Sequence, residues 1–487
     1  MAAWDAEADV VVVGFGGAGA AAAVSAAENG ATVLILEKQD EATHLPTTAL
    51  SGGFAMIVTE VEPATTYPDR CSAGLVPRPV LRAWAERAAE LEGWLESAGV
   101  GLRARPVEPE FLRGAAQPDF EGAGAVANRQ FADTPDGMGL MAGLKAWVAR
   151  CPQVGVRWSL AGERLVRGPG GRVTGVRAVG PGGDVLVGAR RGVVLTCGGF
   201  EHDERMKADY LRAHPVHFAT STANTGDGVR MALAAGADLW HMNGMVGRQV
   251  ARFPLGDGSH LTVQMQIGPP GYVVLDRFGR RFCDEHAYTR VRTVWYEMFA
   301  FDPVSLSYAR IPSYWLFDQR RLAAGPLAAP AGQALTGAYS WSPDNRPEVE
   351  RGWVLEGATV GEAATRAGGA DAEATERSVR IYNEACSRGE DEFGRPAATL
   401  VPLDSPPFYC VPLYPGASNT SGGPRRNERA EILDPFGDAI PGLYGAGELG
   451  QAIAHLYPSP GASLSDALCF GRIAGQSAAS SNPDPDI

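Results

Sequence analysis

Residues 9–37 constrain the fold of this chain more than any other stretch, because they read as a complete strand, turn, helix and strand. Residues 10–13 are all valine, which is typical of a parallel strand buried on both faces. In the glycine turn that follows, Gly14 permits a tight bend, Gly16 lets the backbone approach a pyrophosphate, and Gly19 lets the helix pack closely on the strand. The pattern predicts a dinucleotide site at the start of a Rossmann-like α/β domain.

The rest of this unit predicts further contacts with the dinucleotide. Free N–H groups at the helix start, including those of Gly17 and Ala18, and the positive end of the helix dipole would face the phosphates. Glu37 follows the second strand, where a carboxylate can accept hydrogen bonds from an adenosine ribose, and Lys38 comes directly after it.

A loop of small hydroxyl residues comes next and ends in two glycines, so its backbone can approach a flat ring or a phosphate. An ordinary cluster of turn residues is the alternative interpretation. The position of the loop directly after a dinucleotide unit favours contacts with the cofactor. The residues expected to make them are Thr47, Thr48, Ser51, Gly52 and Gly53.

The composition changes in the middle of the chain. Between residues 248 and 414 aromatic residues, Arg and Pro become frequent, while the regular glycine turns become rarer. We interpret residues 248–414 as a substrate domain inserted into a cofactor domain that residues 1–247 and 415–487 build together. Such an insertion creates a cleft, and clefts hold substrates.

Charge and cysteine content exclude several classes of protein. A net charge of −13 argues against a nucleic-acid partner, which clustered Lys and Arg would be needed to bind. The seven cysteines are scattered, without Cys-x-x-Cys spacing, so neither a disulfide framework nor a metal site is expected. The sequence shows no signal peptide and no run of about 18 apolar residues that would span a membrane. A cytoplasmic protein without a transmembrane segment is the expectation.

Several segments, in order along almost the whole chain, resemble the flavoprotein superfamily that includes soluble fumarate reductases and 3-ketosteroid dehydrogenases. They are residues 14–19 with Glu37 and Lys38, 48–53, 198–200, 225–228, 279–285, 443–448 and 463–472. The resemblance implies a Rossmann-like FAD-binding domain with an inserted α+β catalytic (cap) domain. It implies FAD as the cofactor, bound noncovalently, because His44 does not have the spacing of the flavin-linking histidine in succinate dehydrogenases. It adds to the expected FAD-binding residues Gly198, Gly199, Asp227, Gly447, Glu448, Ser463 and Leu464.

Two positions distinguish the branches of this superfamily. Soluble fumarate reductases carry a His in the segment before the last sheet strand and an Arg in the turn after Gly-Ala-Gly-Glu. Residues 415–423 and 457–459 hold neither. The proton-donating Arg of those enzymes falls near Thr289, with Arg290 one place away. A dicarboxylate would therefore lose most of its cationic partners, and fumarate reduction is not expected.

The 3-ketosteroid Δ1-dehydrogenases carry Tyr-Pro-Gly-Pro-Gly in the same turn, and residues 457–461 read Tyr-Pro-Ser-Pro-Gly. The resemblance implies that the Tyr457 hydroxyl and the Gly461 N–H polarise a substrate ketone, as an oxyanion hole does. The two prolines stiffen this turn. Tyr288 stands where these enzymes place a tyrosine after an Arg-Phe/Tyr-x-Asn-Glu motif, and it is the expected base for the α-proton. Packing in an aromatic-rich domain is the alternative role for Tyr288.

The leading hypothesis is a flavin-dependent oxidoreductase acting on CH–CH groups, which dehydrogenates a C–C bond next to a ketone in a steroid-like or polycyclic substrate. An external electron acceptor would reoxidise the flavin. A flavin ene-reductase that works in the opposite direction on an enone or enoate is one alternative. A flavin-binding protein without turnover is another.

Overall fold

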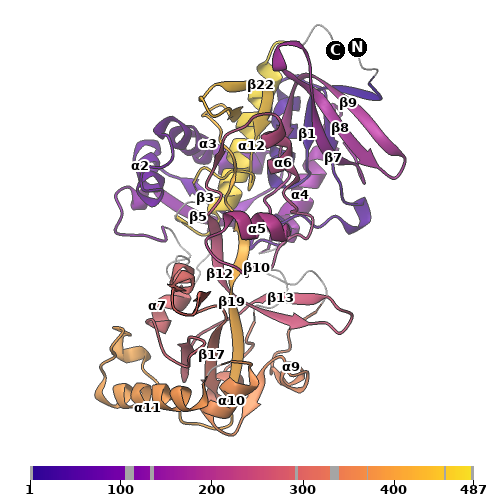
Figure 1. The fold of residues 1–487 in the computed structure, drawn as a ribbon. Helices are drawn as coiled ribbons and strands as arrows, with labels where there is room; N and C mark the ends of the chain where they lie inside the picture. Colours follow the sequence, from indigo (N-terminus) through magenta and orange to yellow (C-terminus); the bar gives the residue numbers. More distant parts are fainter. Residues whose placement is uncertain are drawn as a thin grey trace. The chain divides into compact units, whose positions relative to one another are not determined.

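The computed structural model describes residues 4–104, 115–131, 136–290, 294–328, 339–369, 371–453 and 457–483. Within these ranges the side chains of residues 288–290, 294–296 and 417 are outside the description. The chain divides into two compact units. Unit 1 comprises residues 1–211, 220–245 and 419–487, and unit 2 comprises residues 212–219 and 246–418 (Figure 1).

A largely parallel sheet forms the centre of unit 1. Its strands follow the order β21-β22-β9-β1-β2-β6, with β7 and β8 attached to β9 as an antiparallel meander. The pairs β22–β9, β9–β1, β1–β2 and β2–β6 are all parallel. The bounds are β1 (Ala6–Val13), β2 (Val33–Leu36), β6 (Val154–Arg157), β7 (Ala161–Arg167), β8 (Val173–Gly180), β9 (Gly183–Leu195), β21 (Glu431–Leu433) and β22 (Ala439–Gly445). The valines of β1 are fully buried, as a central parallel strand requires.

Two helices of small residues pack against each other in unit 1. Helix α1 (Gly17–Glu28) follows β1 directly, and α12 (Ala462–Ser480) follows the turn of residues 457–461. A Cβ on Gly471 would lie 2.5 Å from the Ala18 carbonyl oxygen, and one on Gly475 would lie 2.1 Å from that of Ala22. The glycines therefore let the two backbones approach more closely than larger residues would allow.

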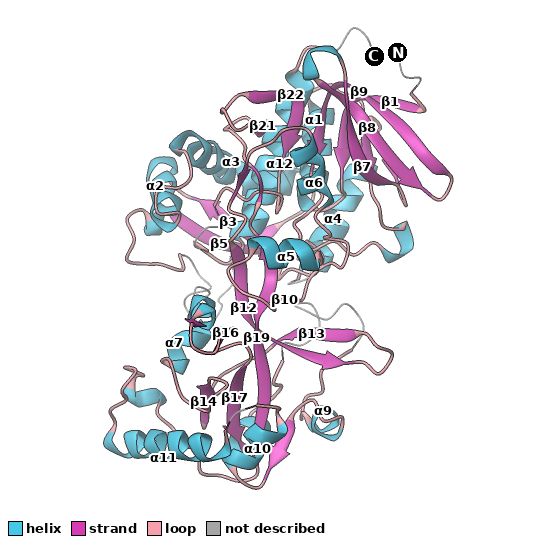
Figure 2. Cartoon of the chain, viewed as in Figure 1, coloured by secondary structure: helices cyan, strands magenta, loops and turns pink. Residues whose placement is uncertain are grey.

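A small antiparallel sheet and two helices complete the part of unit 1 that positions the candidate site (Figure 2). The sheet has the order β3-β5-β4, and the helices α2 and α3 precede β5 in the chain. The bounds are β3 (Phe54–Val58), α2 (Val61–Cys71), α3 (Arg78–Ser97), β4 (Leu102–Arg103) and β5 (Val126–Phe131).

Unit 2 is built on a second, mostly antiparallel sheet of order β13-β12-β19-β17-β14, in which β10 and β18 also pair with β19. Aromatic side chains, including Trp315, Phe317 and Tyr409, fill one of its cores. The bounds are β10 (His217–Phe218), β12 (Met245–Pro254), β13 (His260–Gln264), β14 (Tyr272–Leu275), β17 (Ser313–Asp318), β18 (Leu355–Gly357) and β19 (Phe408–Thr420). The helices α7 (Glu285–Arg290), α10 (Val360–Arg366) and α11 (Ala372–Arg388) belong to the same unit.

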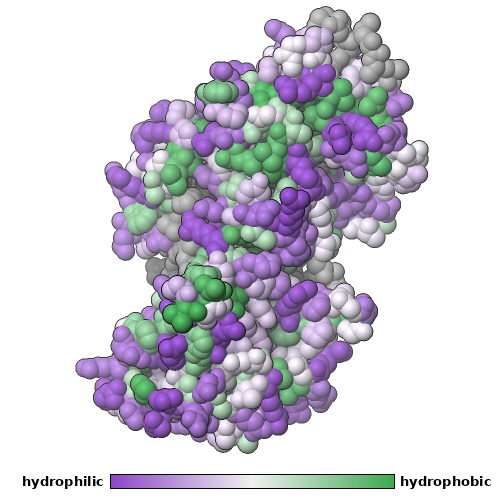
Figure 3. Space-filling view, in the orientation of Figure 1, coloured by the Kyte–Doolittle hydropathy of each residue, from purple (hydrophilic) through white to green (hydrophobic). Residues whose placement is uncertain are grey.

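The expected fold class, a Rossmann-like domain with an inserted α+β domain, is confirmed. The described helices include none that is both long and apolar enough to cross a membrane. The face drawn in Figure 3 is covered mainly by hydrophilic residues.

Candidate active site

In the first turn, the packing of the protein itself requires glycine at positions 14 and 19 but not at position 16. Gly14 has φ +101°, and a Cβ there would lie 2.6 Å from the Thr196 carbonyl oxygen. A Cβ on Gly19 would lie 2.1 Å from the Gly14 carbonyl oxygen, so only glycine lets α1 approach β1 this closely. At Gly16 the nearest atom to such a Cβ is 3.7 Å away, an ordinary contact. The space beside Gly16 therefore fits a group that approaches the backbone from outside, as a pyrophosphate would.

The hydroxyl loop is anchored to the start of α1. The Gly17 N–H donates to Thr48 Oγ1 at 2.9 Å. Within the loop, Ser51 Oγ donates to the Thr48 carbonyl oxygen at 2.7 Å and accepts from the Gly53 N–H at 3.2 Å. The Gly52 carbonyl accepts from the Gln130 side chain at 2.8 Å, which ties the loop to β5. These bonds fix the position of the backbone that the sequence predicts beside the cofactor.

Glu37 is buried at the end of β2, and both of its carboxylate oxygens accept hydrogen bonds from backbone N–H groups. Its Oε2 accepts from the Phe15 N–H at 2.7 Å, and its Oε1 accepts from the Gln39 N–H at 2.8 Å. Burial alone would raise the pKa of Glu37, but the His44 ring and these two N–H groups lower that pKa below its ordinary value. The side chain is therefore an ionised acceptor, which suits a ribose hydroxyl.

Aromatic rings lie around Glu37, and no local sequence pattern indicates them. The His44 ring stacks on Phe15 with centroids 5.7 Å apart and meets Trp158 edge-on at 5.0 Å. His44 Nε2 lies 3.7 Å from Glu37 Oε2. In the sequence, His44 invites comparison only with the flavin-linking histidine of succinate dehydrogenases. Its contact with Trp158 joins positions too far apart in the chain for a local pattern to indicate.

Lys38 and Asp227 are brought together, although 189 positions separate them in the sequence. Lys38 Nζ lies 2.6 Å from Asp227 Oδ2 and donates to Thr225 Oγ1 at 2.8 Å. Burial would raise the pKa of Asp227, but the hydrogen bond and charge of Lys38, together with Arg230, lower it. The start of α6 (Asp227–Ala234) is thereby linked to the end of β2.

A buried polar cluster connects three of the predicted FAD segments. Asn224 Nδ2 donates to Thr47 Oγ1 and to Glu448 Oε2, both at 3.0 Å. Glu201 Oε1 accepts from the Thr420 N–H at 2.5 Å and from its hydroxyl at 2.7 Å. Burial raises the pKa of both carboxyl groups, and the charge of Glu201 raises that of Glu448 further.

Gly198 and Gly199 pack directly against this cluster. A Cβ on Gly199 would lie 2.1 Å from Thr420 Oγ1 and 2.4 Å from Glu201 Oε1, and Gly198 has φ +74°. After β22, a Cβ on Gly447 would lie 3.0 Å from the Cβ of Ala18, so the turn that follows β22 lies beside the start of α1.

The turn of residues 457–461 brings its two predicted polarising groups together. The Gly461 N–H donates to Tyr457 Oη at 2.9 Å. Gly461 has φ +84°, and a Cβ there would lie 2.7 Å from the Phe54 carbonyl group, so the position requires glycine. A hydroxyl that accepts such a bond is polarised and becomes a stronger donor for a further acceptor. Beyond the turn, Ser463 Oγ donates to Asn419 Oδ1 at 3.4 Å, and Leu464 is buried.

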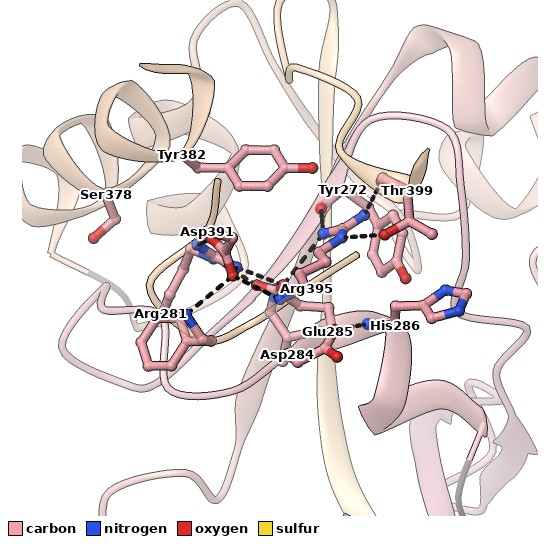
Figure 4. A network of polar contacts seen from close by, with 12 residues as sticks. Tyr272, Arg281, Asp284, Glu285, His286, Ser378, Tyr382, Asp391, Arg395 and Thr399 are labelled. Atoms are coloured by element: carbon pink, nitrogen blue, oxygen red, sulfur yellow. Dashed lines mark hydrogen bonds and ion pairs between the residues drawn. The ribbon is translucent and has the colours of Figure 1, made fainter. Parts of the chain in front are cut away.

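Tyr288 lies in α7 of unit 2, but its side chain is outside the described residues. A buried ion network holds the start of this helix (Figure 4). Arg281 donates to both oxygens of Glu285 at 2.7 Å and to Asp391 Oδ1 at 2.6 Å. Arg395 Nη1 donates to Glu285 Oε2 at 3.2 Å. The segment of residues 279–285 thus fixes the start of the helix that contains Tyr288.

The described residues contain no group of three or more His, Cys, Asp or Glu side chains arranged to hold a metal ion. The polar groups in unit 1 are instead arranged around a glycine turn and a helix start, as a dinucleotide requires.

Comparison with known proteins gives the family. Residues 9–464 match the family described as FAD binding domain. The chain is 26% identical to digoxin reductase from Eggerthella lenta, over 99% of this chain and 88% of that protein. It is 27% identical to 3-oxosteroid 1-dehydrogenase from Mycolicibacterium smegmatis, over 96% of each. The crystal structure of 3-ketosteroid Δ1-dehydrogenase from Sterolibacterium denitrificans covers 97% of this chain and is itself covered to 99%, with 23% identity and a TM-score of 0.81.

These relatives are flavoprotein oxidoreductases, and the residues around Gly16, Glu37 and Glu448 fit their cofactor. FAD is accordingly the cofactor of this chain. The chain belongs to the FAD binding domain family, within the superfamily of fumarate reductases and 3-ketosteroid dehydrogenases, and is an FAD-dependent oxidoreductase that acts on CH–CH groups.

Proposed function

We propose that this enzyme dehydrogenates a C–C bond next to a ketone in a steroid-like or polycyclic substrate. The observation that carries the proposal is the pairing of Tyr457 Oη with the Gly461 N–H at 2.9 Å, at the start of α12. In this structure the Gly461 N–H donates to Tyr457 Oη rather than standing beside it as a second donor to the substrate. A hydroxyl polarised in this way suits the oxygen of a ketone, on which negative charge develops when the neighbouring C–H bond breaks. The names of the relatives, digoxin reductase and 3-oxosteroid 1-dehydrogenase, support a steroid-like substrate.

In this mechanism the residues of the chain bind and polarise the substrate. Tyr457 donates a hydrogen bond to the ketone oxygen, and the Gly461 N–H supports that hydroxyl. Tyr288, ionised to its phenolate, would take up the α-proton. FAD, when bound, supplies the acceptor for the hydride. Gly16 would leave room for the pyrophosphate and Glu37 would accept from the ribose of the dinucleotide, and an external acceptor takes up the electrons afterwards.

An anaerobic assay with the oxidised protein tests the proposal. A panel of 3-ketosteroids and simpler cyclic ketones is added, and the flavin absorbance near its visible maximum is followed. Accepted ketones bleach the flavin, and Tyr457→Phe slows the bleaching by about 100-fold or more, as expected for a donor to a developing oxyanion. Tyr444→Phe is the matched control, because its hydroxyl lies 2.5 Å from Ser481 Oγ, away from the turn. The proposal fails if no ketone bleaches the flavin, or if Tyr457→Phe reacts as fast as the wild type.

The ene-reductase function is the second candidate, and the relative named digoxin reductase favours it. The protein is reduced with dithionite under anaerobic conditions and then mixed with enones and enoates. Reoxidation by an enone, without bleaching by the corresponding saturated ketone, would assign the reductive direction. A flavin that responds to no compound in either experiment would indicate a binding protein without turnover.

We also propose that FAD is bound noncovalently and that the protein is cytoplasmic. We take FAD to be held noncovalently, so acid precipitation should leave yellow flavin in the supernatant and a colourless pellet. All seven cysteines lie in the described part of the chain and are unpaired there, which agrees with a reducing cytoplasm.

A further inference from the structure

The turn of residues 457–461 is held from outside by side chains that the reaction itself does not use. Tyr67, on α2, is fully buried, and its hydroxyl donates to the Pro458 carbonyl oxygen at 2.5 Å. The same hydroxyl accepts from the Gln117 N–H at 3.0 Å. The Pro458 carbonyl also accepts from the Ala116 N–H at 2.8 Å. Two donors on one carbonyl fix the orientation of the peptide plane between Pro458 and Ser459.

A second tether acts one residue later. Ser459 is fully buried, and its hydroxyl donates to Asn128 Oδ1 on β5 at 2.5 Å. The Ser459 carbonyl accepts from the Ala462 N–H at 3.1 Å, at the start of α12. The proline rings at positions 458 and 460 fix φ at both neighbours of Ser459. Few backbone angles of the turn are therefore free to change.

The end of the turn is fixed by the neighbouring strand. The Gly461 carbonyl accepts from the Met56 N–H at 3.3 Å, and Gly461 sits directly against the backbone of Phe54. The tethers come from α2, β3 and β5, which all belong to unit 1. The Tyr457 hydroxyl and the Gly461 N–H stay 2.9 Å apart on this framework.

We propose that Tyr67 and the Ser459–Asn128 pair are positioning residues, which hold the Tyr457–Gly461 turn in the one arrangement that polarises a substrate oxygen. The inference rests on the proposed function of that turn. A displacement of about 1 Å at a reacting group costs roughly 100-fold in rate. Release of one tether should therefore lower the rate of flavin reduction without changing the binding of FAD, because none of the three side chains belongs to the FAD-binding glycine turn.

The test uses Tyr67→Phe, which removes the hydroxyl and leaves the buried ring in place. Tyr382→Phe is the matched control, because the Tyr382 hydroxyl also donates from a buried ring to a backbone carbonyl, that of Val401 at 2.9 Å, but in unit 2. The rate constant of flavin reduction at saturating substrate should fall by 10- to 100-fold in Tyr67→Phe and by less than twofold in Tyr382→Phe. The dissociation constants of FAD and of the substrate should stay within twofold of the wild type in both variants. An equal loss of rate in the two variants, or none in Tyr67→Phe, overturns the proposal.

Ser459→Ala tests the second tether and replaces Tyr67→Phe if that variant does not fold. Ser465→Ala is its control, because that buried hydroxyl bonds Trp84 Nε1 at 3.1 Å and lies outside the turn. Hydrogen exchange of the backbone amides of Tyr457, Ser459 and Gly461 provides a readout that needs no substrate. Faster exchange there in Tyr67→Phe and Ser459→Ala, but not in the two controls, supports the inference even if no ketone reduces the flavin and the proposed function fails. Unchanged exchange and unchanged rates overturn it.

Discussion

Substitution of single glycines in the first turn separates the demands of the fold from those of the cofactor. Gly19→Ala gains about 1 kcal/mol of helix propensity. The new Cβ would lie 2.1 Å from the Gly14 carbonyl oxygen, so α1 must move away from β1. Overpacking of this kind costs about 1–3 kcal/mol and sometimes more. The contact is with backbone, which puts it at the high end, and we expect a net loss of about 2 kcal/mol in the free energy of unfolding.

Gly16→Ala should behave in the opposite way. Its Cβ meets nothing closer than 3.7 Å, and Gly16 caps α1 with φ −90°, which alanine adopts readily. The poorer cap costs the protein without FAD at most about 1 kcal/mol. The methyl group occupies the space that the pyrophosphate needs, so we expect a loss of about 1–3 kcal/mol in FAD binding. That corresponds to a dissociation constant roughly 5- to 150-fold higher.

The assay removes FAD, measures thermal unfolding of the apoprotein, and then titrates FAD by the quenching of its fluorescence. Gly93→Ala on α3 is the control, because Gly93 is exposed and a Cβ there would meet no atom within 4 Å. It should be neutral or slightly stabilising and should bind FAD normally. The reasoning is refuted if Gly16→Ala unfolds as early as Gly19→Ala, or if it binds FAD as tightly as the wild type.

Two further predictions concern buried charges. Glu285→Gln breaks the network with Arg281 and should lower the free energy of unfolding by about 3 kcal/mol. Glu86→Gln, in an ion pair with Arg82 whose side chains are 54% and 58% exposed, should change it by less than about 1 kcal/mol, and urea unfolding of both variants checks the contrast. The pKa of Glu201 is raised above its ordinary value of 4.5, so the folded protein keeps a proton that the unfolded chain releases, and stability falls as the pH rises above that value. Glu201→Gln should flatten this fall above pH 4.5, and an unchanged slope would contradict the assignment.

The first Rossmann unit could be predicted from the sequence because its signals are local. The valines of β1, the glycines at positions 14 and 19, and the apolar strand β2 each impose their conformation on adjacent residues, and the parallel pairing of β1 with β2 follows from them. The domain boundaries expected at 247/248 and 414/415 lie a few residues from the division that the structure makes. Nothing in the sequence indicates that residues 212–219 belong to unit 2, since this depends on the pairing of the two-residue strand β10 with β19.

One sequence motif puts Tyr457 and Gly461 into the same turn, but nothing in the sequence indicates the contacts between distant residues. Tyr457 and Gly461 are four positions apart, so one turn determines their contact. No role in the site is expected for Glu201 from the sequence, because its hydrogen-bond partner Thr420 is 219 positions away. The hydrogen bond of Ser459 to Asn128 spans 331 positions, and a single sequence shows no sign of it. Such contacts are decided by the packing of whole elements, which hydrophobic period and turn chemistry do not specify.

Because unit 1 is divided along the chain, the ribosome synthesises all of unit 2 before the last segment of unit 1. Residues 419–487 supply β22, which pairs with residues 193–195 of β9, and α12, which covers α1. Unit 2 has left the ribosome completely before this segment begins to emerge. At about 5–20 residues per second, synthesis of this last stretch takes roughly 3–14 s. During that interval the nascent cofactor domain carries an unpaired strand edge and an uncovered helix, the features that favour aggregation. Its solubility during synthesis therefore depends on how quickly residues 419–487 are translated.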